Sequence, residues 1–249
     1  MRWAVSVVAV GALTFAAVPS RADVTITMTT SRTMGKMTSE RLVVIYVKGM
    51  KGRIDMKAPT FDHSILIDVT AKQQLMLNNF AKQTVDLTAT NAALVAQFGD
   101  AKASLILLGQ TKDVLGRICA GYEMLATVPT TLGNEAVNFK MSGPIWLATS
   151  GPDVEEWVAF TKAALAAGIV TSQYCWEAVL PAAPATDRVF AKHGIPLEMF
   201  WTHTVEGNDR VAQQLAALGK QTVTTKVTAI STNPIPDEMF TVPAGYTKK

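Results

Sequence analysis

Polar and apolar residues alternate along much of the chain with the two-residue period of a β-strand that has one buried face. In residues 23–29, polar side chains separate Val24, Ile26 and Met28. A similar period predicts further strands at residues 42–48, 51–57, 64–70, 73–78, 83–88, 104–112, 117–127, 136–141, 145–149, 197–205 and 221–232. Parallel neighbours need a crossover of about a dozen residues. The short connections in the first third of the chain therefore predict an antiparallel meander.

Helical signals occur at three places, residues 90–99, 152–167 and 209–218. The middle one is the strongest, because Pro152 suits a first helical turn, acidic residues follow it and Gly168 ends the run. This segment belongs to a longer stretch, residues 152–193, that separates two groups of strands. We expect that stretch to be a helical insertion laid across the sheet.

These elements predict one α+β domain at residues 23–249. It is expected to be a strongly curved, half-open antiparallel β-sheet of about ten strands, partly covered by helices. A chain of 249 residues with 49% hydrophobic residues is long and apolar enough to bury one large core. No glycine- or serine-rich linker, internal repeat or block of charge indicates a second domain.

Residues 1–22 have the pattern of a secretory signal peptide. Arg2 precedes an apolar run at residues 3–18, and Ser20-Arg21-Ala22 is a small-x-small cleavage site. The run is shorter than the roughly 20 residues that span a membrane. We expect cleavage after Ala22 and a periplasmic or secreted protein that is not an integral membrane protein. The formal net charge of +3 is too small to indicate nucleic-acid binding.

The chain has two cysteines, Cys119 and Cys175. Two thiols in an oxidising compartment favour a disulfide, which we predict here, with two separate buried thiols as the alternative. Such a bond would stabilise the fold by about 3–4 kcal/mol in the chain-entropy model. Zinc is less favoured, because the three histidines show none of the short Cys/His spacings of structural sites. No metal site is predicted.

Catalytic motifs are absent from the sequence. It contains no glycine-rich phosphate loop, no Gly-x-Ser-x-Gly elbow and no His-Glu-x-x-His. Asp62, His63 and Ser64 are the residue types of a serine triad. Neighbouring strand residues point to opposite faces of a sheet, so these three side chains cannot form a proton relay.

Two other sets of titratable residues are also expected to have structural rather than catalytic roles. Glu155 and Glu156 point about 100° apart on a helix and are expected to be solvated in its first turn. His203 has apolar neighbours on a predicted strand, which favours a structural histidine over a ligand. We predict no catalytic residue, no cofactor and no enzymatic activity.

Methionine and tryptophan occupy many of the alternating apolar positions. Methionine is flexible and fills irregular volumes, so a methionine-lined face suits a pliable acyl chain. An ordinary filled core shows the same pattern and is the alternative. The candidates for an apolar binding face and its helical lid are Met28, Met56, Leu75, Leu77, Trp157, Met199 and Trp201.

A series of motifs follows in order along the chain and ends in Phe240-Thr241-Val242-Pro243-Ala244-Gly245-Tyr246. The earlier ones are Val47-Lys48-Gly49 with Arg53-Ile54-Asp55, Ile65-Leu66-Ile67-Asp68, Leu75-Met76-Leu77, residues 109–112, Gly116 with Cys119 and Tyr122, Ile145-Trp146-Leu147 and Gly194-Ile195-Pro196-Leu197. In these motifs the chain resembles a family of exported bacterial domains of unknown function, similar in fold to the LolA/LolB-type periplasmic lipoprotein carriers. The resemblance implies a half-open antiparallel barrel that holds acyl chains under helical lids. It leaves the activity undefined, and residues 152–193 and 209–218 depart from a simple version of the pattern.

The leading hypothesis is a non-enzymatic periplasmic binder or carrier of a lipid or other apolar ligand. The alternative is an envelope structural or interaction protein with a filled core, no small ligand and an envelope protein as partner. A hydrolase that uses His63 or His203 ranks third.

The cleavage site is directly testable. Because Ser20-Arg21-Ala22 precedes the first polar strand residue, the exported protein is expected to begin at Asp23. Intact-mass measurement of envelope-fraction protein checks this. A dominant species that retains residues 1–22 would contradict export by cleavage.

Overall fold

The structure is a computed structural model that describes residues 22–98, 100–132, 135–175, 182–207, 210–217 and 220–249. Its strands are β1 (Val24–Met34), β2 (Met37–Lys48), β3 (Lys51–Ala58), β4 (Phe61–Asp68), β5 (Gln73–Asn78), β6 (Gln83–Asp86), β7 (Lys102–Val114), β8 (Arg117–Leu132), β9 (Glu135–Ala148), β10 (Ile195–Glu206), β11 (Gln221–Ser231) and β12 (Thr247–Lys248). Its helices are α1 (Thr88–Gln97), α2 (Pro152–Ala166), α3 (Ser172–Cys175), α4 (Ala183–His193), α5 (Arg210–Ala217) and the short 3-10 turn η2 (Asp237–Phe240).

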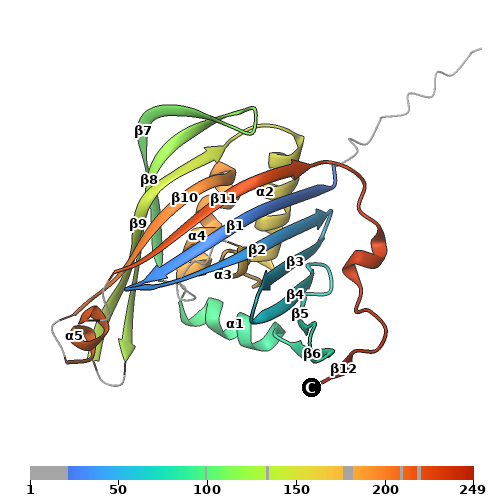
Figure 1. The fold of residues 1–249 in the computed structure, drawn as a ribbon, viewed down its shortest axis with the longest axis horizontal. Coiled ribbons are helices and arrows are strands. Elements are labelled where there is room, and N and C mark those ends of the chain that lie inside the picture. The colour runs from blue at the N-terminus through green and yellow to red at the C-terminus, as the bar shows by residue number, and fades with distance from the viewer. Residues whose placement is uncertain (1–21, 99, 133–134, 176–181, 208–209, 218–219) are drawn as a thin grey trace, which may run out of the picture.

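The described strands form one sheet in the order β12-β6-β5-β4-β3-β2-β1-β11-β10-β9-β8-β7 (Figure 1). Neighbouring strands are antiparallel, except that β12 lies parallel to β6. Strands β1 to β6 form the predicted meander. Strand β1 also pairs with β11, which joins the meander to the second half of the sheet. The sheet is not closed, and its two edges are β12 and β7.

This architecture confirms a mostly antiparallel, open sheet with a few helices and corrects the number of strands, which is twelve in the described chain rather than about ten. The strands predicted at 136–141 and 145–149 are one strand, β9. Gly143 lies between them with φ 153°, and a Cβ there would lie 1.8 Å from the carbonyl oxygen of Phe200 on β10. Only glycine allows β10 to pass so close, and the ladder between β8 and β9 continues through this point.

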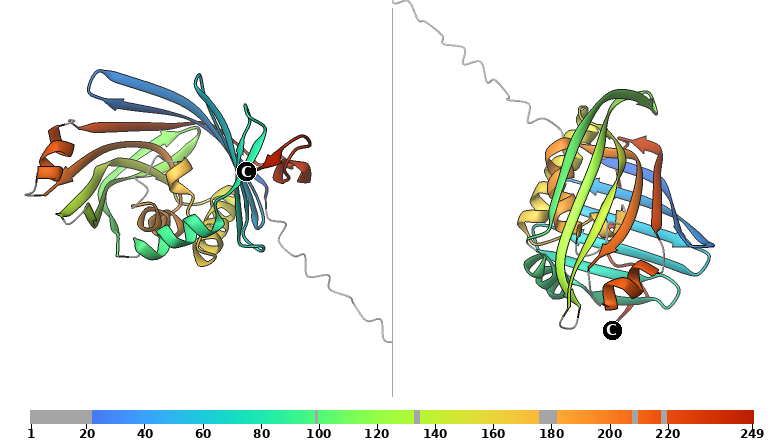
Figure 2. Two further views of the ribbon diagram at one scale, coloured as in Figure 1. Left: turned by 90° about the horizontal axis from the view of Figure 1, so that it is seen from below. Right: turned by 90° about the vertical axis from the view of Figure 1, so that its left-hand side faces the viewer.

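Helices α2 and α4 lie on the concave side of the curved sheet (Figure 2). Pro152 stands in the first turn of α2, and Asp153 and Glu155 lie near the positive end of its dipole. Trp157 and Phe160 of α2 are buried in the core. The predicted helical insertion therefore forms a layer over one sheet face. No helix of the described residues is both long and apolar enough to cross a membrane.

The chain after β11 crosses the opposite, convex face of β3 to β5 as a strap of residues 235–246. The Arg53 guanidinium donates a hydrogen bond of 3.0 Å to the carbonyl oxygen of Met239. Near the other end, the Tyr246 hydroxyl donates one of 2.6 Å to Oδ1 of Asn79. The closing signature thus fastens the C-terminal segment to the sheet.

Packing between α2 and the sheet can be tested at Gly52 on β3. A Cβ at this position would lie 2.4 Å from Cζ of the buried Phe160 ring. Gly52→Ala is therefore expected to lower the free energy of unfolding by about 1–3 kcal/mol, measured by chemical denaturation. Thr29→Ala, on an exposed position of β1, is the control and should stay near wild type.

A double-mutant cycle identifies the contact. Gly52→Ala combined with Phe160→Leu should lose less stability than the two single variants added together, because the smaller side chain relieves the overlap. Wild-type stability of Gly52→Ala would contradict the packing described above.

Candidate functional site

Five of the seven residues predicted for an apolar binding face lie in one buried cluster on the concave side. Met28 comes from β1, Met56 from β3, and Met199 and Trp201 from β10, while Trp157 comes from α2. Their exposed fractions lie between 0% and 6%. The fold therefore brings together side chains that are far apart in sequence, in the layer between the sheet and its helices.

Leu75 and Leu77 do not belong to this face. Leu75 lies opposite Leu66 and Leu77 opposite Ser64 in the β4–β5 ladder, and Leu75 lines a cavity under the C-terminal strap. Residues at alternate positions, such as Met76, pack against the concave cluster instead. The assignment of Leu75 and Leu77 to the concave face was wrong, because β5 is apolar on both faces and the strap buries the second one.

Two polar contacts hold the N-terminal end of α2. Asp153 is buried and pairs with Arg117 at the start of β8, with an Nη2–Oδ2 distance of 2.9 Å. Glu156 accepts a hydrogen bond of 2.8 Å from the backbone N–H of Gly49 in the β2–β3 turn. Glu156 is only 2% exposed, so the expectation that it is solvated was wrong, whereas Glu155 is exposed. Buried carboxylates need such partners, and the two contacts attach the N-terminal end of α2 to the sheet.

A polar spot interrupts the apolar face on β10. Among the described residues, neither Nε1 of Trp201 nor Nε2 of His203 has a hydrogen-bond partner, and both atoms are buried. Burial, and to a smaller extent the nearby Arg32 charge, lowers the pKa of His203 to about 4. The imidazole is therefore neutral at physiological pH, which agrees with a structural role.

Asp187 is a second buried titratable residue in the helical layer. Its carboxylate accepts hydrogen bonds from the backbone N–H groups of Thr171 and Ser172, at 2.6 and 3.0 Å. Burial raises its pKa to about 6, although these hydrogen bonds act in the opposite direction. Asp187, in α4, therefore caps the start of α3 and ties the two helices together.

The predicted disulfide is absent from the structure, because Cys119 is a free buried thiol; the side chain of Cys175 lies outside the described residues. Cys119 lies opposite Lys112 in the β7–β8 ladder, and the Lys112 ammonium lies over the ring of Trp146. Helix α3, which ends at Cys175, packs with α4 and β3 on the concave side. Burial also raises the pKa of the Cys119 thiol.

The Asp62-His63-Ser64 segment does not assemble a relay. Nδ2 of Asn79 donates hydrogen bonds to both Asp62 and Ser64, while the His63 ring lies beside Phe61 at 5.7 Å between centroids. His63 thus points away from its two neighbours in sequence. In the part of the chain that the structure describes, no group of three His, Cys, Asp or Glu side chains is placed to hold a metal ion.

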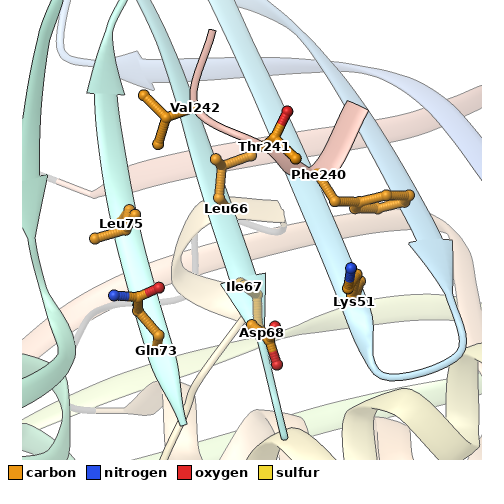
Figure 3. A pocket seen from close by; sticks show the side chains of 9 residues that line it. All are labelled: Lys51, Leu66, Ile67, Asp68, Gln73, Leu75, Phe240, Thr241 and Val242. Carbon is orange, nitrogen blue, oxygen red and sulfur yellow. The ribbon is translucent and has the colours of Figure 1, made fainter. Parts of the chain in front are cut away.

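A cavity of about 220 Å³ lies on the convex face under the strap. Figure 3 shows Phe240 and Val242 of the strap beside Leu66 and Leu75 of the sheet. Lys51 of β3 also lines the cavity. Ligand pockets usually measure roughly 300–1,000 Å³, so this cavity is small for an acyl ligand. It is a gap beneath the strap that the sequence did not predict.

No protein-family model matches the sequence, and no curated protein matches it. Solved structures are similar to the chain at low identity. PNGF-II has 9% identity and a TM-score of 0.37 over 91% of this chain, which spans only 30% of the PNGF-II chain. A LolA superfamily protein from Nitrosomonas europaea has 8% identity and a TM-score of 0.32, with 89% of this chain and 90% of that chain covered.

A DUF1329 family protein from Desulfovibrio piger ATCC 29098 has 8% identity and a TM-score of 0.34, with 90% of this chain and 91% of that chain covered. All three TM-scores lie below 0.5, so these similarities carry no argument about ligand or activity. The family resemblance drawn from the sequence motifs stays a prediction.

The buried neutral His203 makes stability depend on pH. Its pKa is about 4 in the folded protein and about 6.5 when unfolded, so the unfolded state binds the extra proton between these values. Stability should therefore fall as pH drops from about 6.5 to about 4, by up to about 3 kcal/mol from this group. His203→Phe should flatten that fall, as measured by denaturation at a series of pH values.

Trp201→Phe is the matched control, because it changes the neighbouring side chain without removing a titrating group. It should lower stability at every pH and keep the wild-type slope. An unchanged slope in His203→Phe would show that other groups produce the acid sensitivity.

Proposed function

We propose that the protein is a non-enzymatic periplasmic binder or carrier of a lipid or other apolar ligand, with its site on the concave sheet face. The supporting observation is the convergence of Met28, Met56, Met199, Trp201 and Trp157 from separate elements in one buried apolar cluster. Methionine adapts to irregular apolar partners, which suits a flexible acyl chain. In this proposal the helical layer over the cluster is the lid.

The ligand would replace part of the contact between α2 and the sheet. Burying about ten methylenes gains about 8 kcal/mol before ordering costs. Moving a buried tryptophan such as Trp157 out of the core costs about 3–5 kcal/mol. In this proposal the burial of the acyl chain would offset the exposure of one such side chain. Cys119 is a free thiol, so no disulfide from it ties the helical layer to the sheet. Helix α2 is held there by contacts such as the Asp153–Arg117 ion pair.

The alternative is an envelope structural or interaction protein whose core is complete without a ligand. Its support is the close filling of the concave side, where Trp157, Phe160 and Phe190 are each at most 2% exposed. The two proposals differ in one quantity, the free energy needed to displace α2 from the sheet.

Loosening α2 without emptying the core separates the two proposals. Asp153→Asn removes the charge that pairs with Arg117 and should lower the cost of displacing the helix. A fluorescent fatty-acid probe should then bind up to about tenfold more tightly than it binds to wild type, because a larger fraction of the protein is open. Fluorescence titration measures this change.

Glu155→Gln is the matched control, because it removes an exposed charge from the same helical turn. It should leave probe affinity unchanged. If wild type and Asp153→Asn both bind no probe saturably, and native mass spectrometry finds no co-purified lipid, the carrier proposal fails and the filled-core alternative replaces it.

A further inference from the structure

Two buried polar side chains lie next to each other on the concave face of β10. Trp201 and His203 are two residues apart in a regular stretch of the β10–β11 ladder, so both point to the same face. They are 2% and 9% exposed, and Trp201 belongs to the apolar cluster. Neither the indole Nε1 nor the imidazole Nε2 has a hydrogen-bond partner in the described chain. An indole N–H can only donate, so the partner that Trp201 lacks is a hydrogen-bond acceptor.

A cationic side chain lies on the same face, two strands away. Val223 of β11 lies opposite Trp201 on one side and opposite Arg32 of β1 on the other. The Arg32 guanidinium donates a hydrogen bond of 3.0 Å to Oε1 of Gln221, which lies opposite His203. Its charge is also close enough to His203 to contribute to the lowered pKa of the imidazole. Arg32, Trp201, His203 and Gln221 thus form one polar group, called here the head-group border.

This border lies where the concave face passes from buried to exposed. On β1, Met28 and Thr30 are buried and Arg32 is exposed, and His203 is the last buried residue of β10. Figure 1 shows that these ends of β1 and β10 lie away from α2. A chain bound along the methionine side chains therefore reaches the border as it leaves the buried region.

The charges on this part of the concave face have one sign. In the described parts of β1, β2, β10 and β11, the charged residues at concave positions are Arg32 and Arg41. Glu198 and Glu206 of β10 occupy the alternate positions, on the convex face, where they pair with Lys112 and Lys140. The border therefore offers hydrogen-bond donors and positive charge to a ligand, with no acidic group beside them.

We propose that the head-group border binds the anionic head group, a carboxylate or a phosphate, of an acyl-chain ligand. The inference rests on the proposed carrier function and adds the chemical class of the ligand. The guanidinium fork of Arg32 matches the oxygen atoms of either head group. Trp201 donates from Nε1, and a neutral His203 can donate from Nε2. Both donors that the free protein leaves without a partner would then be satisfied.

Two fluorescent probes with the same hydrocarbon chain test the proposal. Parinaric acid carries a carboxylate, and its methyl ester is neutral. Wild type should bind the acid about tenfold more tightly than the ester in fluorescence titration. Arg32→Gln should remove most of this preference by weakening only the binding of the acid. Lys226→Gln is the matched control, because it removes the same charge from an exposed, convex position of β11, and it should keep the preference.

Trp201→Phe tests the buried donor, because it keeps an aromatic ring in the core and removes Nε1. It should weaken the acid more than the ester, with circular dichroism as the check on folding. Equal wild-type affinity for the two probes, or an Arg32→Gln variant with the full wild-type preference, would overturn the head-group site and leave the carrier proposal standing. Wild type that binds neither probe saturably would overturn both.

Competition distinguishes the two head groups. Oleate and oleoyl lysophosphatidic acid carry the same chain with a carboxylate or a phosphate. The one that displaces parinaric acid from wild type at the lower concentration identifies the preferred head group. Displacement by neither would overturn the proposal.

Discussion

The burial of one apolar sheet face against α2 and α4 is the constraint on which this structure depends. An open sheet cannot cover its own concave face, and each large side chain left in water costs about 1.5–3 kcal/mol. Trp157, Phe160 and Phe190 supply the missing cover from helices. Helices α2 and α4, which the sequence placed in an insertion between two groups of strands, therefore contribute to the core.

The same burial links folding to the proposed function. Any ligand on the concave face must compete with Trp157 for the surface formed by Met28, Met56 and Met199. The polar contacts of α2 are placed at the sheet rim, where Asp153 meets Arg117 and Glu156 meets the β2–β3 turn. These contacts position the helix without adding polar groups to the apolar face itself. The two proposals therefore share one fold and differ in how strongly α2 is attached to the sheet.

The convex face and the two edges of the sheet are covered in different ways. The strap at residues 235–246 covers the convex face of β3 to β5, and the last residues close the β6 edge. Strand β7, at the other edge, has β8 as its strand neighbour in the described sheet, is packed by α4 and carries exposed apolar side chains such as Ile106 and Leu107. The C-terminal segment therefore completes one end of the sheet, whereas the other end keeps exposed apolar side chains.

The sequence by itself determined the strand periodicity, the antiparallel meander and the strongest helix, because alternation and helix-end residues are local properties. It also identified Met28, Met199 and Trp157 as members of a common apolar set. It did not determine which face each residue of β5 presents, since Leu75, Met76 and Leu77 are all apolar and only the strap distinguishes the two sides. The tertiary structure likewise decided that Glu156 is buried and that Cys119 is a free buried thiol. Those outcomes depend on which elements pack on which face. Such long-range contacts cannot be inferred from the hydrophobic periodicity of the sequence.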